Sequence, residues 1–387
     1  MISSIVSSTL MITEVMALEV DREVMPRITI GGRVMATVDN YDWDTNKTKE
    51  DEINLEDSAI LARFDKRVYD GGVAGAVVGF KEDGDAVKFQ QMNAFYWNQD
   101  FGVTVGRTRL RNTIIEFPTI RDDDLEDYTH VGNGSSNDQD FDGIYGKQAS
   151  FDWFFDRKLQ TLGAWVGTRR NGTGFSTAPD GIDSYGVNYV YKQPEDYRYV
   201  KWIRHAGVSL DSQKVQLSTG EERMNAIIAG IEFNLNMQPA KNWSMGVQAI
   251  SNDGAGTITS ADIVHTNANA ASNRARAASN SLVASLRYTA RPKLLTRWQT
   301  ALTVAYKDYS DVSSATQWSV TPSLVYTLGQ GVDLLAQVIH TSYGSGLGDG
   351  SDNTYQIGIS FSLETMFNDS IGERSDILGL EHGYIKR

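Results

Sequence analysis

Five histidines are the side chains in this chain best suited to acid–base or metal chemistry: His130, His205, His265, His340 and His382. None of them forms the closely spaced pair that binds zinc, and none stands beside a candidate nucleophile. The chain has no Cys, so it offers neither a thiolate ligand nor a disulfide. The pattern favours neither a metal centre nor a hydrolytic triad, and we expect neither an enzyme nor a bound cofactor.

Two other stretches contain residues of ligand-binding types. The aspartates of 138–143 could coordinate Ca²⁺, but no glutamate follows at the position that closes an EF-hand loop. The glycine-rich stretch 344–350 lacks the Lys-Ser/Thr pair and the helix of a phosphate-binding loop. We interpret both stretches as loops.

Charged side chains recur instead on one face of segments that alternate polar and apolar residues. The cations on these faces are Arg33, Arg63, Arg67, Arg169, Lys192, Lys201, Arg287 and Lys307. The acids are fewer: Asp65, Asp152, Glu232 and Asp333. A long connection and its edges add a mixed group, Arg107, Arg109, Arg111, Arg121, Asp122, Asp123, Asp124, Glu126 and Asp127. Basic walls that face an acidic loop across water would create a transverse field that orients polar solutes and selects ions.

The segments that carry these charges have the period of β-strands. In 354–363, the residues Tyr355, Ile357 and Ile359 fall on one face, and Gln356 and Ser360 fall on the other. The polar face carries mainly small groups, and the apolar face ends in aromatics. This arrangement is typical of a barrel strand whose outside meets lipid and whose inside lines a lumen.

Sixteen segments are strand candidates, and most have the length that a tilted strand needs to cross a bilayer. They are 27–40, 57–69, 72–81, 87–98, 101–107, 143–155, 159–169, 184–192, 199–210, 224–236, 243–250, 281–290, 298–309, 317–328, 332–341 and 354–363. In a membrane barrel, a charged side chain is tolerated in the wall where it faces water. The charged faces therefore predict a wet interior.

The connections alternate in length. Those after odd-numbered candidates tend to be long, such as 44–56, 108–142, 211–223 and 251–280, and those after even-numbered candidates are short, such as 70–71 and 99–100. Long loops on one rim and short turns on the other are typical of outer-membrane barrels. An even strand count then places both termini on the short-turn side.

Composition agrees with this prediction. The net charge of −13 leaves no basic stripe for phosphates, so nucleic acid is not an expected partner. The 35 Gly, 17 Tyr and 8 Trp suit twisted strands with aromatic girdles. No apolar run reaches about 18 residues, the length of a membrane-spanning helix.

The segments outside the candidates divide the chain into three. Residues 1–26 form an N-terminal segment whose beginning resembles a secretory signal with a small-residue cleavage site after Ala17. Residues 27–363 form the barrel. Residues 364–387 form a tail, which we expect on the periplasmic side.

The even strand count, the alternation of loop lengths and the dominant connection after the fifth strand resemble the sixteen-stranded porins of Gram-negative outer membranes. The resemblance implies an all-β transmembrane antiparallel barrel with an inward-folded third external loop, here 108–142. It also implies a homotrimer in the outer membrane. One departure is the connection 82–86, which is too short to latch onto a neighbouring subunit.

The function expected from this resemblance is a water-filled channel for passive diffusion of ions and small polar solutes. We expect Arg107, Arg109, Arg121, Asp122, Asp123, Asp124, Glu126 and Asp127 to build the constriction, and Arg33, Arg63, Arg67, Arg169, Lys201 and Arg287 to line the wall. Two alternatives stay open. One is an anion- or substrate-specific channel with a ladder of Arg and Lys, and the other is a structural or adhesive barrel that works through its long loops.

Overall fold

The computed structural model describes residues 26–367, apart from 45–47, 56–57, 69–70, 84–85, 110–113, 116, 121–124, 130, 132–144, 157–158, 169–181, 183, 194–201, 218–219, 239–240, 266, 268–269, 294–295 and 330. The expected N-terminal segment lies outside this range, except its last residue Pro26. The expected tail 364–387 lies outside it from residue 368 onward, and its first four residues continue the last strand.

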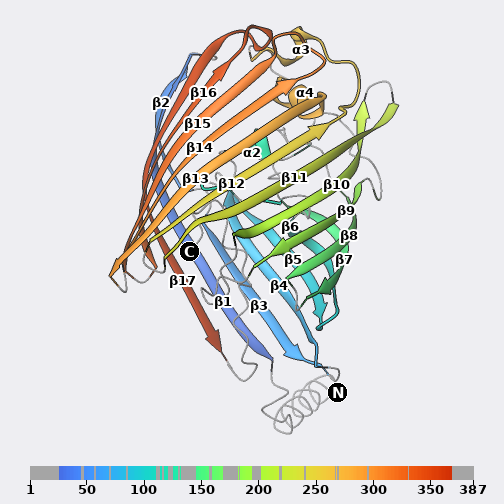
Figure 1. Cartoon of the computed structure of the whole chain (residues 1–387), viewed down its shortest axis with the longest axis vertical. Coiled ribbons are helices and arrows are strands. Elements are labelled where there is room, and N and C mark those ends of the chain that lie inside the picture. Colours follow the sequence, from blue (N-terminus) through green and yellow to red (C-terminus); the bar gives the residue numbers. More distant parts are fainter. Residues whose placement is uncertain are drawn as a thin grey trace, which may run out of the picture.

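In the part of the chain that the structure describes, seventeen strands form one antiparallel sheet (Figure 1). They are β1 (Arg27–Trp43), β2 (Thr48–Asn54), β3 (Ala59–Arg67), β4 (Val73–Asp83), β5 (Ala86–Trp97), β6 (Phe101–Arg109), β7 (Tyr145–Phe155), β8 (Gln160–Thr168), β9 (Ser184–Lys192), β10 (Ile203–Leu217), β11 (Gly220–Gln238), β12 (Lys241–Asn252), β13 (Ser279–Lys293), β14 (Thr296–Tyr309), β15 (Thr316–Gly329), β16 (Val332–Tyr343) and β17 (Gly350–Phe367). The sheet closes into a barrel because β1 pairs with β17 from Ile28 opposite Phe367 to Trp43 opposite Asp352.

Two of these strands share one position in the barrel. β3 pairs with the first half of β1, from Arg27 to Arg33, and β2 pairs with the second half, from Thr37 to Trp43. The barrel therefore has sixteen strand positions, as the alternation predicted. The expectation that 44–56 is a loop was wrong, because 48–54 continues the wall as β2.

Two further connections are shorter than expected. β10 continues to Leu217 and β11 begins at Gly220, so most of 211–223 is strand and not loop. β4 ends at Asp83 and β5 begins at Ala86, so most of 82–86 is strand as well. In β10 the inward side chains of Val215 and Leu217 are buried in a cluster that includes Ile114, from the connection between β6 and β7. This burial stabilises the strand beyond the point where the sequence becomes polar.

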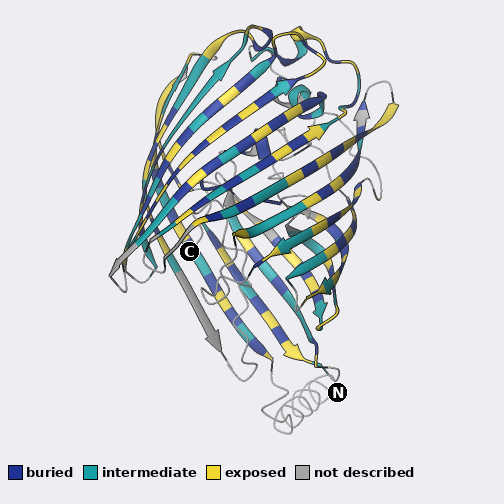
Figure 2. Cartoon of the chain, in the orientation of Figure 1, coloured by how far each residue is buried: buried dark blue, intermediate teal, exposed yellow. Residues whose placement is uncertain are grey.

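The two faces of the wall are inverted relative to a soluble protein (Figure 2). On β1, Arg33 and Thr37 are 5% and 2% exposed, whereas Val34 and Val38 are 58% and 55% exposed. On β17, Ile357 is 69% exposed and Gln356 is fully buried. A polar interior and an apolar exterior are expected where the outer surface contacts lipid. The alternation predicted for the closing strand is confirmed.

Aromatic pairs mark the rim with the short turns. Trp243 of β12 packs on Tyr288 of β13 with ring centroids 4.7 Å apart, and Trp298 of β14 packs on Tyr326 of β15 at 4.3 Å. Such amphipathic rings suit the boundary between hydrocarbon and water. Among the residues that the structure describes, no helix is long and apolar enough to cross a membrane.

The helices lie in the connections of the opposite rim. α3 (Ser260–Ile263) and α4 (Ala270–Arg276) connect β12 to β13, and η3 (Ser345–Leu347) connects β16 to β17. Ile258 and Ile263 pack with Leu347 in one buried cluster, which joins the two connections. α2 (Glu126–Thr129) belongs to the connection between β6 and β7. The first residues of β1 and the last of β17 pair at the short-turn rim.

Candidate channel lumen

The inward faces of the strands carry buried charges of both signs. The cations are Arg27, Arg33, Arg63, Arg287 and Lys307. The carboxylates are Asp39, Asp65, Asp152, Asp211, Glu232 and Asp333. Charges in a barrel wall are stable where they are paired or hydrated. The wall is therefore built for a polar interior, and among the described buried charges neither sign dominates.

One charged cluster lies on β1 and β3, near the short-turn rim. Arg27 Nε and Nη2 donate to the two oxygens of Asp65, at 3.1 and 3.0 Å, and Arg63 forms a second salt bridge with the same carboxylate. The Arg63 guanidinium also stacks over the ring of Phe95, 4.5 Å from its centroid, and lies 5.2 Å from that of Trp97. Arg63 is therefore held in one orientation against the wall. The Asp65 carboxylate, itself fixed by Arg27, binds its guanidinium on one side, and the rings of Phe95 and Trp97 stack on it.

A second cluster centres on Glu232 of β11. Its Oε1 lies 3.6 Å from Arg204 of β10 and 3.8 Å from Arg287 of β13. The register of β10 shifts between Ile203 and His205, so Arg204 occupies a bulge. A bulge re-aims side chains out of strict alternation, which brings Arg204 within reach of Glu232.

Part of the connection between β6 and β7 lies against the inward faces of distant strands. Gln248 of β12 accepts a hydrogen bond from the Ile115 amide at 3.0 Å and donates to the Thr129 carbonyl at 3.2 Å. Gln337 of β16 accepts from the Ile120 amide at 3.0 Å. Each bond joins the backbone of this connection to a side chain of the wall.

Apolar packing supports these bonds. Ile114 and Ile115 belong to a buried cluster with the inward residues Val215, Ile228 and Val283. Ile120 packs in another cluster with Met35 of β1 and Leu335 of β16. These two clusters are where apolar inward residues of the wall contact the connection between β6 and β7, and a separate apolar cluster lies on β3 to β5. We name the described residues of this stretch, 114–115, 117–120, 125–129 and 131, the inner segment.

The turn of the inner segment at α2 is fixed to β13 and β14, behind which Figure 1 draws it. Lys307 of β14 donates to the Asp127 carbonyl at 2.7 Å, and Ser281 of β13 donates to the Tyr128 carbonyl at 2.8 Å. From the sequence we expected Asp127 to face the basic wall that includes Arg33 and Arg63. The structure places the Asp127 backbone beside Lys307, and the Asp127 side chain is exposed.

The other residues predicted to line the constriction or the wall fall into three groups: buried on an inward face, exposed, or not fully described. Arg33, Arg63 and Arg287 are buried on inward faces, and Arg67 is exposed at the end of β3. The backbones of Arg109 and Glu126 are described and their side chains are not. Outside the described residues lie Arg121, Asp122, Asp123, Asp124, Arg169 and Lys201.

Arg107 does not share a face with the inner segment. It pairs with Met92 of β5 and Lys147 of β7, and it follows Val105 in the alternation of β6. Met92, Lys147 and Val105 are all exposed on the outer face. Strand alternation therefore puts Arg107 on the outer face too, and its assignment to the constriction was wrong.

Several residues of the lumen were missed by sequence reasoning. Arg27 shares the inward face of β1 with Arg33, so alternation could have found it. Arg204 depends on a bulge that left no clear mark in the sequence. Gln248 and Gln337 are neutral, so a search for charges passed over them. Among the described residues, no group of three His, Cys, Asp or Glu side chains is placed to hold a metal ion, and 138–143 lies outside them.

Comparisons identify this architecture. No protein-family model matches the chain, and no curated protein matches its sequence. Solved structures do match. The anion-selective porin from Comamonas acidovorans is 13% identical, with a TM-score of 0.59, and the match covers 87% of this chain and 100% of the porin. The outer membrane channel DcaP of Acinetobacter baumannii is 11% identical, with a TM-score of 0.63 over 88% and 98% of the two chains.

A third match is the trimer form of OmpT, an outer membrane protein of Vibrio cholerae. It is 9% identical, with a TM-score of 0.56, and the match covers 88% of this chain and all of OmpT. At these identities the likeness concerns the fold, and it extends around the whole barrel. The chain has the closed sixteen-position antiparallel barrel of Gram-negative outer-membrane porins.

Proposed function

We propose that this chain forms a water-filled channel in the outer membrane of a Gram-negative bacterium and lets ions and small polar solutes diffuse passively. The observation that carries the proposal is the closed barrel with charged side chains on its inward face and exposed apolar side chains on its outward face. The structural likeness to porins and to the DcaP channel supports it. The proposal assigns the chain a role in transport and not in catalysis.

Conductance tests this proposal directly. Purified protein inserted into a planar lipid bilayer should give discrete steps of current in KCl. A structural or adhesive barrel with a closed interior would insert without conducting. Absence of current steps from folded, inserted protein would therefore reject the channel and favour that alternative.

We also propose that the connection 108–142 forms the narrowest part of the channel. The inner segment supports this, because its backbone bonds to Gln248, Gln337 and Lys307 from inside the wall. Sixteen strands enclose a lumen wide enough to need such a narrowing if it is to sieve small solutes. Deleting 119–132 should raise the single-channel conductance. An unchanged conductance would place the narrowest part elsewhere.

The ion preference should be modest, since buried charges of both signs line the wall. Changing Asp122, Asp123 and Asp124 to Asn should shift the reversal potential in a KCl gradient toward anions, because it removes negative charge from the connection that we place at the constriction. The Comamonas neighbour is named as anion-selective, which keeps an anion-specific channel as the second candidate. Saturation of current by one anion species, and not by others, would favour that candidate.

We propose a homotrimer, on the fold and on the trimer form of OmpT. Native mass spectrometry of the protein in detergent should show three copies, and a spectrum of monomer alone would oppose the proposal.

We propose further that residues 1–17 are a cleaved signal and that the tail 364–387 is periplasmic. Amino-terminal sequencing of the mature protein tests the first. A cysteine at Ser375 tests the second: in whole cells it should stay unlabelled by a reagent that cannot cross the outer membrane.

A further inference from the structure

Arg107 and Lys147 lie side by side on the outer face of the barrel. Lys147 of β7 is directly opposite Arg107 of β6 in strand register, and Met92 of β5 is opposite Arg107 on the other side. Met92 is 49% exposed, as expected of an outward side chain. Two cations therefore stand together on a face that is otherwise rich in apolar side chains.

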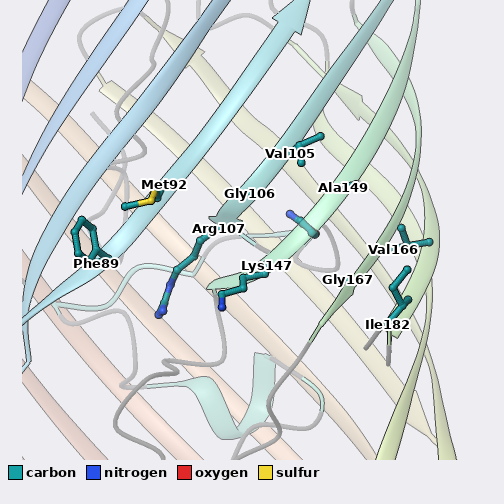
Figure 3. Close-up of a pocket in the computed structure, with 11 residues that line it drawn as sticks. Phe89, Met92, Val105, Gly106, Arg107, Lys147, Ala149, Val166, Gly167 and Ile182 are labelled. Atoms are coloured by element: carbon teal, nitrogen blue, oxygen red, sulfur yellow. The ribbon is translucent and has the colours of Figure 1, made fainter. Parts of the chain in front are cut away.

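The two cations line an open pocket of about 610 Å³. Its other walls are mainly apolar and include Phe89, Val105, Val166 and Ile182. Figure 3 shows Phe89 and Met92 on one side of the cations and Val166 and Ile182 on the other. The pocket thus combines a cationic centre with hydrocarbon-like flanks.

The position of the pocket in the wall suits a membrane boundary. Arg107 lies near the end of β6, and Lys147 lies near the beginning of β7, where the chain enters and leaves the long connection 110–144. Side chains at this level of a barrel reach from the apolar belt into the headgroup region. A cation there contacts lipid phosphates more readily than solutes in the lumen.

Arg107 and Lys147 also repel each other, because like charges directly opposite on neighbouring strands are unfavourable. A phosphate between them would offset that repulsion, with the Arg guanidinium as a two-pronged donor and the Lys ammonium as a point charge. We propose that this pocket binds the phosphate headgroup of an anionic membrane lipid, whose acyl chains lie against Phe89, Met92 and Val166. The inference depends on the proposed insertion of the barrel in a membrane and does not depend on conduction.

The test uses the full chain in detergent and native mass spectrometry with phosphatidylglycerol added in steps. Phosphatidylcholine serves as the zwitterionic comparison and inorganic phosphate as the competitor. The variant Arg107→Gln/Lys147→Gln should bind phosphatidylglycerol about 25-fold more weakly than the wild type, about fivefold for each cation near an anionic headgroup. The charge-conserving variant Lys147→Arg should bind almost as the wild type does.

A matched control is Lys66→Gln, because Lys66 is an exposed cation near the opposite end of the wall. This variant should keep wild-type binding. The proposal is overturned if the double variant binds phosphatidylglycerol as tightly as the wild type, or if Lys66→Gln loses as much affinity. Complete displacement of the lipid by inorganic phosphate would assign the site to the free ion. A change in subunit number with unchanged lipid binding would assign the pocket to a second copy of the chain.

Two controls keep these outcomes separate. Heat-dependent mobility on gels, which reports folded barrel, shows whether the double variant folds. Conductance of the wild type tests the proposed channel, so a barrel that binds lipid without conducting would refute the channel and leave the lipid site standing.

Discussion

Gln248 is the wall residue whose loss should most clearly release the inner segment. Its amide accepts from Ile115 at 3.0 Å and donates to the Thr129 carbonyl at 3.2 Å, so one side chain holds both ends of the segment. Gln248→Leu keeps a similar side-chain length and removes both bonds. We expect the segment to leave the wall more often and the current through the open channel to fluctuate.

The size of the effect follows from what replaces the two bonds. If the Ile115 amide and the Thr129 carbonyl stayed buried without partners, each would cost about 1–3 kcal/mol. Water in the lumen can reach both groups once the segment moves, so the net loss approaches the usual value of about 0.5–1.5 kcal/mol for each bond. The sum of about 1–3 kcal/mol raises the released population by roughly 5-fold to 150-fold.

Two measurements check this. Single-channel recordings should show more frequent transitions in Gln248→Leu, and hydrogen exchange of the Ile115 amide should accelerate by a similar factor. Gln317→Leu is the control, since Gln317 is also buried on an inward face and is not bonded to the inner segment. Equal protection of the Ile115 amide in wild type and Gln248→Leu would show that the two bonds do not hold the segment, and the reasoning would fail.

Three further predictions concern other charged groups. Asp65→Asn should lower the urea midpoint of barrel unfolding by the equivalent of about 3 kcal/mol, because it leaves two buried arginines without their carboxylate; an unchanged midpoint would contradict this. Glu232→Gln should shift the reversal potential toward anions, since it removes a negative charge from the lumen, and a shift toward cations would oppose the assignment. Hydrogen bonds from the Thr259 hydroxyl and backbone amide hold the pKa of Asp262 below its ordinary 3.8. The stabilisation of α3 by this cap is therefore complete above pH 3.8 and is lost as the pH falls through the lowered pKa of Asp262. Hydrogen exchange of α3 should accelerate over that fall in the wild type, and Asp262→Asn should remove this pH dependence.

The barrel itself could be predicted because its signal is local. Alternation of period two depends on neighbouring residues, and the contrast between lipid and lumen keeps that pattern clear in strands such as β15 and β17. The same rule explains where the prediction failed. β2 carries the charged run Lys49 to Glu52, and this composition predicts a loop. A strand that extends beyond the bilayer contacts water on its outer face, so nothing in its composition separates it from a loop.

Arg107 shows a different kind of error. Its closeness to Arg109 and Arg111 suggested one basic group at the constriction. Val103 and Val105, however, already set the outward face of β6, and counting on by two reaches Arg107. Alternation along β6 thus predicts which face Arg107 occupies, whereas its nearness to Arg109 and Arg111 in the sequence does not. In a barrel wall the face decides what a side chain contacts, because a shift of one residue moves it from lumen to lipid.

The contacts that hold the inner segment could not be predicted from the sequence, because they join residues 133 and 217 positions apart, as for Ile115 with Gln248 and Ile120 with Gln337. These contacts lie on one side of the barrel wall. The described part of the segment is held mainly by β10 to β16 and by Met35 of β1. The opposite side of the wall, on β3 and β5, carries Arg63 stacked on Phe95. The Arg63 side chain is 2% exposed, so its charge acts on that side of the interior through the field of its cluster with Arg27 and Asp65 and not through direct contact.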